Sequence, residues 1–120
     1  MPQTFPKKER LSGKTSIDRL LRCARYGHVG GMKYAFAEGS GLDYNRLLIS
    51  VSKRLFKRAV RRNLLKRRIR EAYRTQKDLL PPQGIDVLLT YDTKEILPYA
   101  SVRESVAAAL SEIASRIKSI

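Results

Sequence analysis

Positions 53–74 form a dense basic block, and any fold proposed for this chain has to accommodate it. Eleven of the 25 Lys and Arg residues lie in the block, and Glu71 is its only acidic residue. Because helix formers dominate and neither Gly nor Pro interrupts them, the pattern predicts a helix over residues 58–76, ended by the Pro- and Gly-containing turn at residues 81–84. Like charges at i,i+4 spacing destabilise such a helix, so we expect it to have an anionic partner.

The side chains of this predicted helix separate into two stripes, since successive residues are rotated by about 100°. One stripe is polar and almost entirely cationic, and consists of Asn63, Lys66, Arg67, Arg70 and Arg74. The other is apolar and predicts the face that packs on a sheet, and consists of Leu65, Ile69, Ala72 and Tyr73. We therefore expect a packed helix with its basic side turned outward.

The charge of the whole chain indicates the class of partner. The formal net charge is +14, whereas the 98 residues outside the basic block carry 14 basic and 10 acidic residues, so the excess belongs to one site. Arg predominates in the block, and a guanidinium can bind two phosphate oxygens or stack on a base. An anionic membrane surface is a weaker alternative, because it requires an exposed apolar stripe beside the charge. Nucleic acid is the expected partner.

Length and composition exclude several other classes of protein. A chain of 120 residues predicts a single domain over residues 1–120, which the basic block makes a nucleic-acid-binding one, with residues 1–10 as a flexible basic segment. No apolar run approaches the roughly 20 residues of a membrane span and no secretion signal is evident, so a cytoplasmic location is expected. The chain has one cysteine, Cys23, and one histidine, His28, which is too few for most metal sites and catalytic triads. The 11 acidic residues show no pair of carboxylates spaced as in a hydrolase active site. We expect no catalytic side chain and no metal ligand.

The rest of the chain predicts a short helix, three strands and a long helix. They are expected at residues 17–23 (helix), 32–37, 46–52 and 85–91 (strands), and 100–117 (helix). Thr15 or Ser16 can cap the first helix. The order helix, strands, basic helix, strand, helix predicts an α/β (α+β) fold, a two-layer sandwich.

Two aromatic residues of the first predicted strand allow two interpretations. Tyr34 and Phe36 point to one side of the strand, and Ala35 and Ala37 to the other. Aromatic residues on a strand usually belong to the core. On a sheet face beside Ser50, however, they could also stack on unpaired bases.

Several motifs resemble one known family. Residues 49–54 (ISVSKR), followed by residues 59–74 (AVRRNLLKRRIREAYR), resemble the signature of the bacterial ribonuclease P protein subunit, and residues 5–11 (FPKKERL) with the short helix after them match it too. The chain departs from the family at two places. Leu64 stands where the family has the second Arg of its Arg-Asn-Arg core, so that contact is lost or falls to Arg61 or Arg68. The segment 55–58 is also one residue longer than the usual turn.

This resemblance implies an α/β sandwich with a left-handed βαβ crossover that binds a large catalytic RNA. In that family the RNA performs the chemistry with Mg²⁺, held mainly by the RNA, and removes the 5′ leader of precursor tRNA. The expected partners are therefore ribonuclease P RNA and precursor tRNA, with no membrane and no required protein partner. A ribosomal or other structural RNA-binding protein is the alternative, and it would present one extended interface without a separate leader cleft.

The resemblance also implies two sets of binding residues. Those expected to bind the catalytic RNA are Lys53, Arg54, Lys57, Arg58, Arg61, Arg62, Asn63, Lys66, Arg67 and Arg70. Those expected to line a leader-binding cleft between the first helix and the sheet are Ile17, Leu21, Tyr34, Phe36, Ser50 and Arg54.

Overall fold

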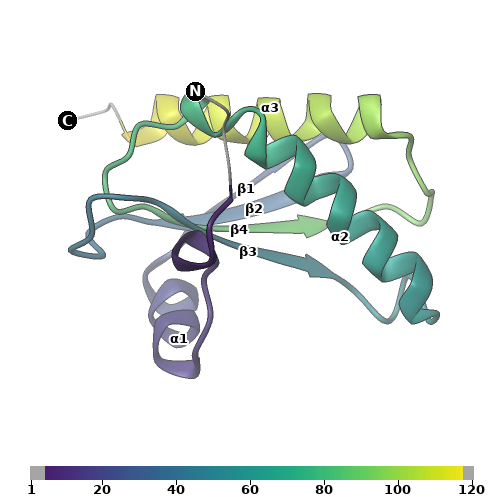
Figure 1. Cartoon of the computed structure of the whole chain (residues 1–120), viewed down its shortest axis with the longest axis horizontal. Coiled ribbons are helices and arrows are strands. Elements are labelled where there is room, and N and C mark those ends of the chain that lie inside the picture. The colour runs from purple at the N-terminus through teal and green to yellow at the C-terminus, as the bar shows by residue number, and fades with distance from the viewer. Residues whose placement is uncertain (1–4, 118–120) are drawn as a thin grey trace.

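A four-stranded sheet and three α-helices make up most of residues 5–117, the part of the chain that the computed structural model describes (Figure 1). The helices and strands are α1 (Lys14–Cys23), β1 (Arg25–Val29), β2 (Met32–Ala37), β3 (Arg46–Val51), α2 (Ala59–Arg74), β4 (Asp86–Tyr91) and α3 (Tyr99–Ile117). Two short 3₁₀ turns, η1 (Lys7–Glu9) and η2 (Lys77–Leu79), complete the order. No helix within these residues is long and apolar enough to cross a bilayer.

The sheet has the order β1-β2-β4-β3 and contains both kinds of strand pairing. β1 pairs with β2, and β2 with β4, in antiparallel fashion, whereas β3 and β4 are parallel. α2 connects these two parallel neighbours, so the predicted βαβ unit is present. The handedness of its crossover stays a prediction.

Helices lie on both faces of the sheet (Figure 1). α2 and α3 cover one face, and their buried side chains form the main core with the sheet. α1 packs on the opposite face, where Leu20 is fully buried beside Leu11 and Ala37. The expected α+β class is confirmed, but the two-layer description fits only the sheet with α2 and α3, because α1 has its own small apolar cluster.

Side chains alternate along each strand as expected for a sheet with two different faces. In β3, Leu47, Ile49 and Val51 belong to the main core, whereas Leu48 packs on the α1 side. The apolar stripe of α2 is confirmed as well, since its four members are the buried residues of that helix.

Strand β1 was not predicted from the sequence, because its glycines suggested a loop. Gly30 adopts φ 54° in the two-residue turn between Val29 and Met32, which is the geometry of a tight hairpin. Gly27 lies inside the strand opposite Tyr34, and a Cβ there would come within 2.2 Å of the Tyr34 ring. Both glycines therefore permit the hairpin.

The start of α1 also differs from the prediction. The helix begins at Lys14, three residues earlier than expected, and Gly13, with φ 89°, occupies the N-cap position. Ser16 does not cap it; its hydroxyl accepts a hydrogen bond of 3.5 Å from Arg46. The other predicted elements agree with the structure to within one or two residues at each end.

Residues 5–10, which we expected to be flexible, lie against the fold. The Leu11 amide donates to the Leu47 carbonyl (2.8 Å), and Glu9 forms an ion pair with Lys77 (2.9 Å). The Phe5 ring packs edge-on against Tyr73, with 5.5 Å between ring centroids. These contacts place η1 beside the start of β3 and the end of α2. Residues 1–4 of the predicted flexible segment lie outside the described residues.

Candidate nucleic-acid interface

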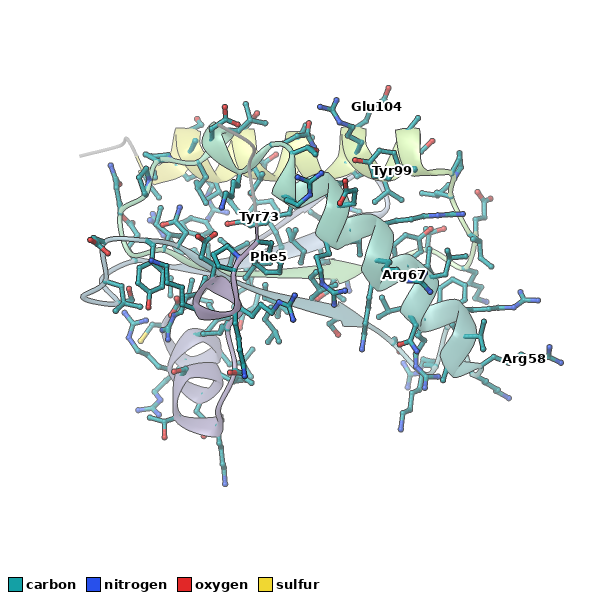
Figure 2. The ribbon with its side chains drawn as sticks, in the orientation of Figure 1. Phe5, Arg58, Arg67, Tyr73, Tyr99 and Glu104 are labelled. Atoms are coloured by element: carbon teal, nitrogen blue, oxygen red, sulfur yellow. The ribbon has the colours of Figure 1, made fainter. Side chains whose placement is uncertain are left out.

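The ten residues assigned to catalytic-RNA binding lie on α2 and on the loop that leads into it. Figure 2 places Arg58 at the start of α2 and Arg67 nearer its middle. Most of the ten are exposed, and Arg62, Lys66 and Arg70 are half-buried. We call this set the basic surface: Lys53, Arg54, Lys57, Arg58, Arg61, Arg62, Asn63, Lys66, Arg67 and Arg70.

The positive charge of the basic surface is not neutralised by the protein. None of its cations forms an ion pair within residues 5–117. Glu71, the only acid in the block, is bound by Arg74 at 2.5 Å, and these hydrogen bonds lower the pKa of its carboxyl. Uncompensated charge on one face creates a field that attracts polyanions.

The N-terminus of α2 adds to this field. Arg58 is the N-cap residue, no side chain caps the helix and its first turn contains no acid. Aligned peptide dipoles place partial positive charge at this end, so cations here repel the helix as well as one another. Lys57, Arg58 and Arg61 line a hollow there, together with Lys94 from the loop after β4. Lys94 was not predicted, because only the fold brings that loop to the helix.

Two arginines of α2 have structural contacts. Arg62 donates one Nη1 group to the carbonyls of Phe56 (2.8 Å) and Lys57 (2.9 Å), and so holds the loop before the helix. Arg68 donates to the Leu97 carbonyl before α3. Arg68 is therefore turned toward the protein, whereas Arg61 stays exposed.

The basic surface continues onto η1. Lys66 and Arg70 line a hollow of about 170 Å³ together with Arg10 and Phe5. The buried Nε of Arg70 has no hydrogen-bond partner in the described part of the chain. The three cations that line this hollow, Arg10, Lys66 and Arg70, make it suited to an anion such as a phosphate.

Tyr34 and Phe36, the aromatic residues assigned to the leader cleft, do not line it. Both side chains are in the main core under α3, with relative exposures of 1% and 0%. The Tyr34 hydroxyl donates to the Glu112 carboxylate and accepts from Arg116 (3.2 Å). The assignment was wrong because alternation places both rings on the face opposite α1, where no base can reach them.

The other predicted cleft residues are near α1. Ile17 packs on the α1 side of the sheet, and Leu21 is 48% exposed. Ser50 is half-buried on the same face, and Arg54 is exposed in the loop after β3. The strand register places more partly exposed side chains on this face, next to Ser50 and Leu48. We call the resulting set the open sheet face: Tyr26, Lys33, Leu48, Ser50, Leu88 and Thr90.

Tyr26 supplies the exposed aromatic ring of the open sheet face. It lies opposite Ala35, its side chain is 59% exposed, and its hydroxyl donates to the Leu21 carbonyl (3.1 Å). The sequence analysis missed it together with β1. Its position two residues before a Gly-Gly turn, in register with the alternating strand that follows, was a usable signal.

A buried ion pair fixes α1 against the sheet. The Asp86 carboxylate is fully buried and accepts two hydrogen bonds of 2.8 Å from Arg46. Arg19 of α1 reaches the same carboxylate at 3.3 Å and also donates to the Glu38 carbonyl (2.6 Å). The hydrogen bonds from Arg46 to Asp86 raise the pKa of the Arg46 guanidinium. This network ties α1, which carries Leu21, to the strands.

The described residues do not fit a protein-held metal ion. Residues 5–117 contain no group of three or more His, Cys, Asp or Glu that could hold one. His28 approaches Asp92 at 3.4 Å, but no third ligand accompanies them.

A mixed four-stranded sheet with an uncompensated basic helix on one side defines a small α+β nucleic-acid-binding protein. The Ribonuclease P family model matches residues 5–114, and the chain belongs to this family. The ribonuclease P protein component of Thermotoga maritima is 40% identical over 118 residues, covering 94% of this chain and 98% of that protein. The Porphyromonas gingivalis W83 protein of the same name is 39% identical over 83 residues, covering 66% of this chain.

The fold is shared with solved structures of this family. The structure of the Thermotoga maritima RNase P protein superposes with a TM-score of 0.75 and 28% identity in that superposition, covering 87% of this chain and 96% of the other. The match to the Porphyromonas gingivalis relative spans 61% of that protein's length. The expectations of fold and family are thus confirmed.

Proposed function

We propose that this chain is the protein subunit of ribonuclease P, which assists Mg²⁺-dependent endonucleolytic removal of the 5′ leader from precursor tRNA. The observation that carries the proposal is the basic surface, whose cations have no ion pair within residues 5–117. Membership of the family and the names of its relatives support it. The basic surface binds the catalytic RNA through phosphate contacts, which supply affinity and orientation.

The open sheet face takes the single-stranded leader. Ile17, Leu21, Ser50 and Arg54 keep the role that the resemblance implies. Tyr26 replaces Tyr34 and Phe36 as the stacking ring, because its side chain is exposed on this face. Lys33, whose side chain is 60% exposed, lies 3.8 Å from Asp92 in a loose ion pair and adds a cation that the leader backbone can reach.

The protein supplies binding and the RNA supplies the reaction. The catalytic RNA with its Mg²⁺ hydrolyses the phosphodiester, and no side chain of this chain takes part in bond cleavage. Cations on the basic surface replace part of the counterion atmosphere of the RNA, so the complex needs less bulk Mg²⁺. The cytoplasmic location and independence from a protein partner remain predictions.

Competition binding tests this proposal against a general structural RNA-binder. The full chain is titrated into a labelled bacterial ribonuclease P RNA, with an unlabelled, unrelated structured RNA of equal length as competitor. We expect the ribonuclease P RNA to bind at least about tenfold more tightly at moderate salt, where nonspecific contacts are weakened. Equal affinity for the two RNAs would favour the structural RNA-binder.

A further inference from the structure

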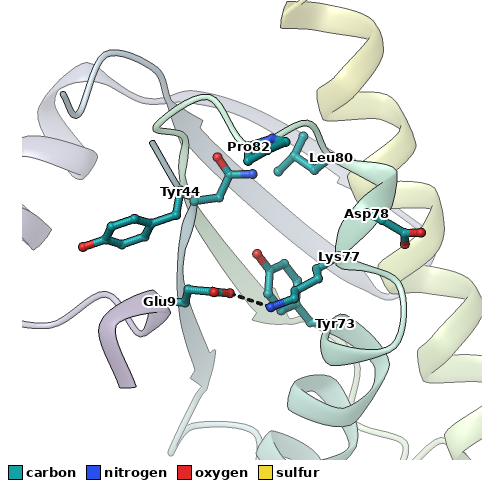
Figure 3. A pocket seen from close by; sticks show the side chains of 8 residues that line it. Glu9, Tyr44, Tyr73, Lys77, Asp78, Leu80 and Pro82 are labelled. Carbon is teal, nitrogen blue, oxygen red and sulfur yellow. Dashed lines mark hydrogen bonds and ion pairs between the residues drawn. The ribbon is translucent and has the colours of Figure 1, made fainter. Parts of the chain in front are cut away.

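A separate pocket of about 250 Å³ lies between η1, the start of β3 and η2 (Figure 3). It shares no residue with the basic surface or with the open sheet face. Small-molecule sites usually have volumes of about 300–1,000 Å³, so this one suits a single ring system rather than a whole nucleotide. Its walls are formed by Glu9, Tyr44, Asn45, Tyr73, Lys77, Asp78, Leu80 and Pro82.

The Tyr73 hydroxyl is the unusual feature of this pocket. The side chain is 1% exposed, yet its hydroxyl makes no hydrogen bond within residues 5–117. Burial, together with the nearby charge of Glu9, raises the pKa of Tyr73, so the group remains a protonated donor. Arg70 Nε is the one fully buried side-chain polar atom without a partner in residues 5–117, so the Tyr73 oxygen is not sealed in the core. It reaches the pocket and is available to a ligand there.

The remaining walls suit a flat, polar ring. Figure 3 shows Leu80 and Pro82 above the Glu9–Lys77 ion pair and Tyr73, and the Tyr44 ring directed outward at the edge of the pocket. Lys8 lies 4.7 Å from the centroid of the Tyr44 ring, so the ring is held in place. Aromatic side chains stack on any base, and every base carries hydrogen-bond acceptors at its edges.

A path of cations joins the pocket to the basic surface. Lys66 and Arg70 share their hollow with Arg10 and Phe5. The Arg10 guanidinium lies over the Phe5 ring at 5.4 Å, and Phe5 packs directly on Tyr73. An RNA backbone that crosses the basic surface toward η1 therefore arrives at the pocket.

We propose that this pocket receives one unpaired base of the RNA bound by the basic surface, with the base against Tyr44 and hydrogen-bonded by the Tyr73 hydroxyl. The inference rests on the proposed function, because it takes the partner to be that RNA. The pocket then contributes base-edge recognition, whereas the basic surface contributes phosphate contacts.

The test compares Tyr73→Phe and Tyr44→Ala with the matched control Tyr99→Phe at the start of α3. Dissociation constants of the full chain from a bacterial ribonuclease P RNA are measured over a range of salt. We expect Tyr73→Phe to weaken binding about threefold to tenfold, the effect of one hydrogen bond, and Tyr44→Ala about tenfold. Neither variant should change the salt slope, because neither removes a charge, and the control should bind as the wild type does.

Two further readouts separate this role from a structural one. Urea unfolding of Tyr73→Phe should be unchanged, since its hydroxyl has no partner among residues 5–117. Ultraviolet crosslinking of the wild-type complex, followed by mass spectrometry, should give a nucleotide adduct on the peptide that contains Tyr44. A loss of stability in Tyr73→Phe with unchanged RNA affinity would instead indicate that the hydroxyl has a structural role, and would contradict the base contact.

The outcomes distinguish the two proposals. If the wild-type chain binds ribonuclease P RNA but both pocket variants bind equally well, the pocket inference is wrong and the proposed function stands. If the wild-type chain does not prefer that RNA, both are wrong. Weaker binding by the two variants, with an unaltered salt slope and the Tyr44 adduct, supports the pocket.

Discussion

Tyr26 lies directly opposite Ala35 in the β1–β2 pair, so its ring stands on the face of the sheet that carries α1. Tyr34 is only one register position away, opposite Gly27, and its ring is buried under α3. The two tyrosines are close in the sheet and differ completely in access to a ligand. This difference determines which ring can meet an RNA base.

Replacing Tyr26 should affect the leader specifically. We expect Tyr26→Ala to weaken the binding of precursor tRNA by the holoenzyme about tenfold, because the variant loses one base-stacking contact. The binding of mature tRNA should be unchanged. Tyr26→Phe is the matched control and should keep most of the affinity. Fluorescence titration with the two substrates measures the difference, and an equal loss for both would contradict a leader contact.

Phe36→Ala should act on stability. The side chain is fully buried in the main core, so its truncation should lower the free energy of unfolding by about 3–5 kcal/mol. Urea denaturation followed by circular dichroism measures this change. The folded variant should bind substrates with and without a leader with the same relative affinities as the wild type does. A stable Phe36→Ala variant with a selective leader defect would restore the original assignment.

Arg67→Ala should alter the salt dependence of RNA binding. Arg67 is exposed on α2 and makes no ion pair within residues 5–117, so its charge is free to neutralise a phosphate. We expect the slope of log K against log salt to decrease by about one. Arg103→Ala, which removes an exposed arginine from α3, serves as the control and should leave the slope unchanged. Equal slopes for both variants would place the RNA elsewhere.

Asp86→Asn should loosen α1. This change leaves Arg46 half-buried without its carboxylate, and breaking a buried pair typically costs about 3–5 kcal/mol. Urea denaturation measures this change in the free energy of unfolding. Asp18→Asn, an exposed acid on the same helix, should change stability by less than about 0.5 kcal/mol. A small effect of Asp86→Asn would mean that the apolar cluster around Leu20 alone holds the helix.

The sequence predicted the elements with strong periodicity best. The apolar stripe of α2, including Leu65 and Ile69, is buried as its spacing indicated. β1 was missed because Gly27 and Gly30 masked a strand whose side chains are mostly exposed. Alternation also placed Tyr34 and Phe36 on one face, but it cannot tell which face a helix will cover.

Parts of the candidate site depend on contacts between distant segments. Arg10 reaches the basic surface only because η1 docks beside β3, and Lys94 only because the loop after β4 passes the start of α2. The pocket beside Tyr73 likewise combines residues from three segments. Periodicity and motif spacing describe local structure, so these neighbours were accessible only from the fold.

Cleavage of precursor tRNA at low, roughly physiological Mg²⁺ tests the central claim most directly. A bacterial ribonuclease P RNA is assayed alone, with the purified full chain, and beside a control that contains the chain without the RNA. We predict correct 5′ maturation only when both components are present, with no cleavage by the protein alone. Tight RNA binding without any stimulation of cleavage, or an unchanged Mg²⁺ requirement, would contradict the account.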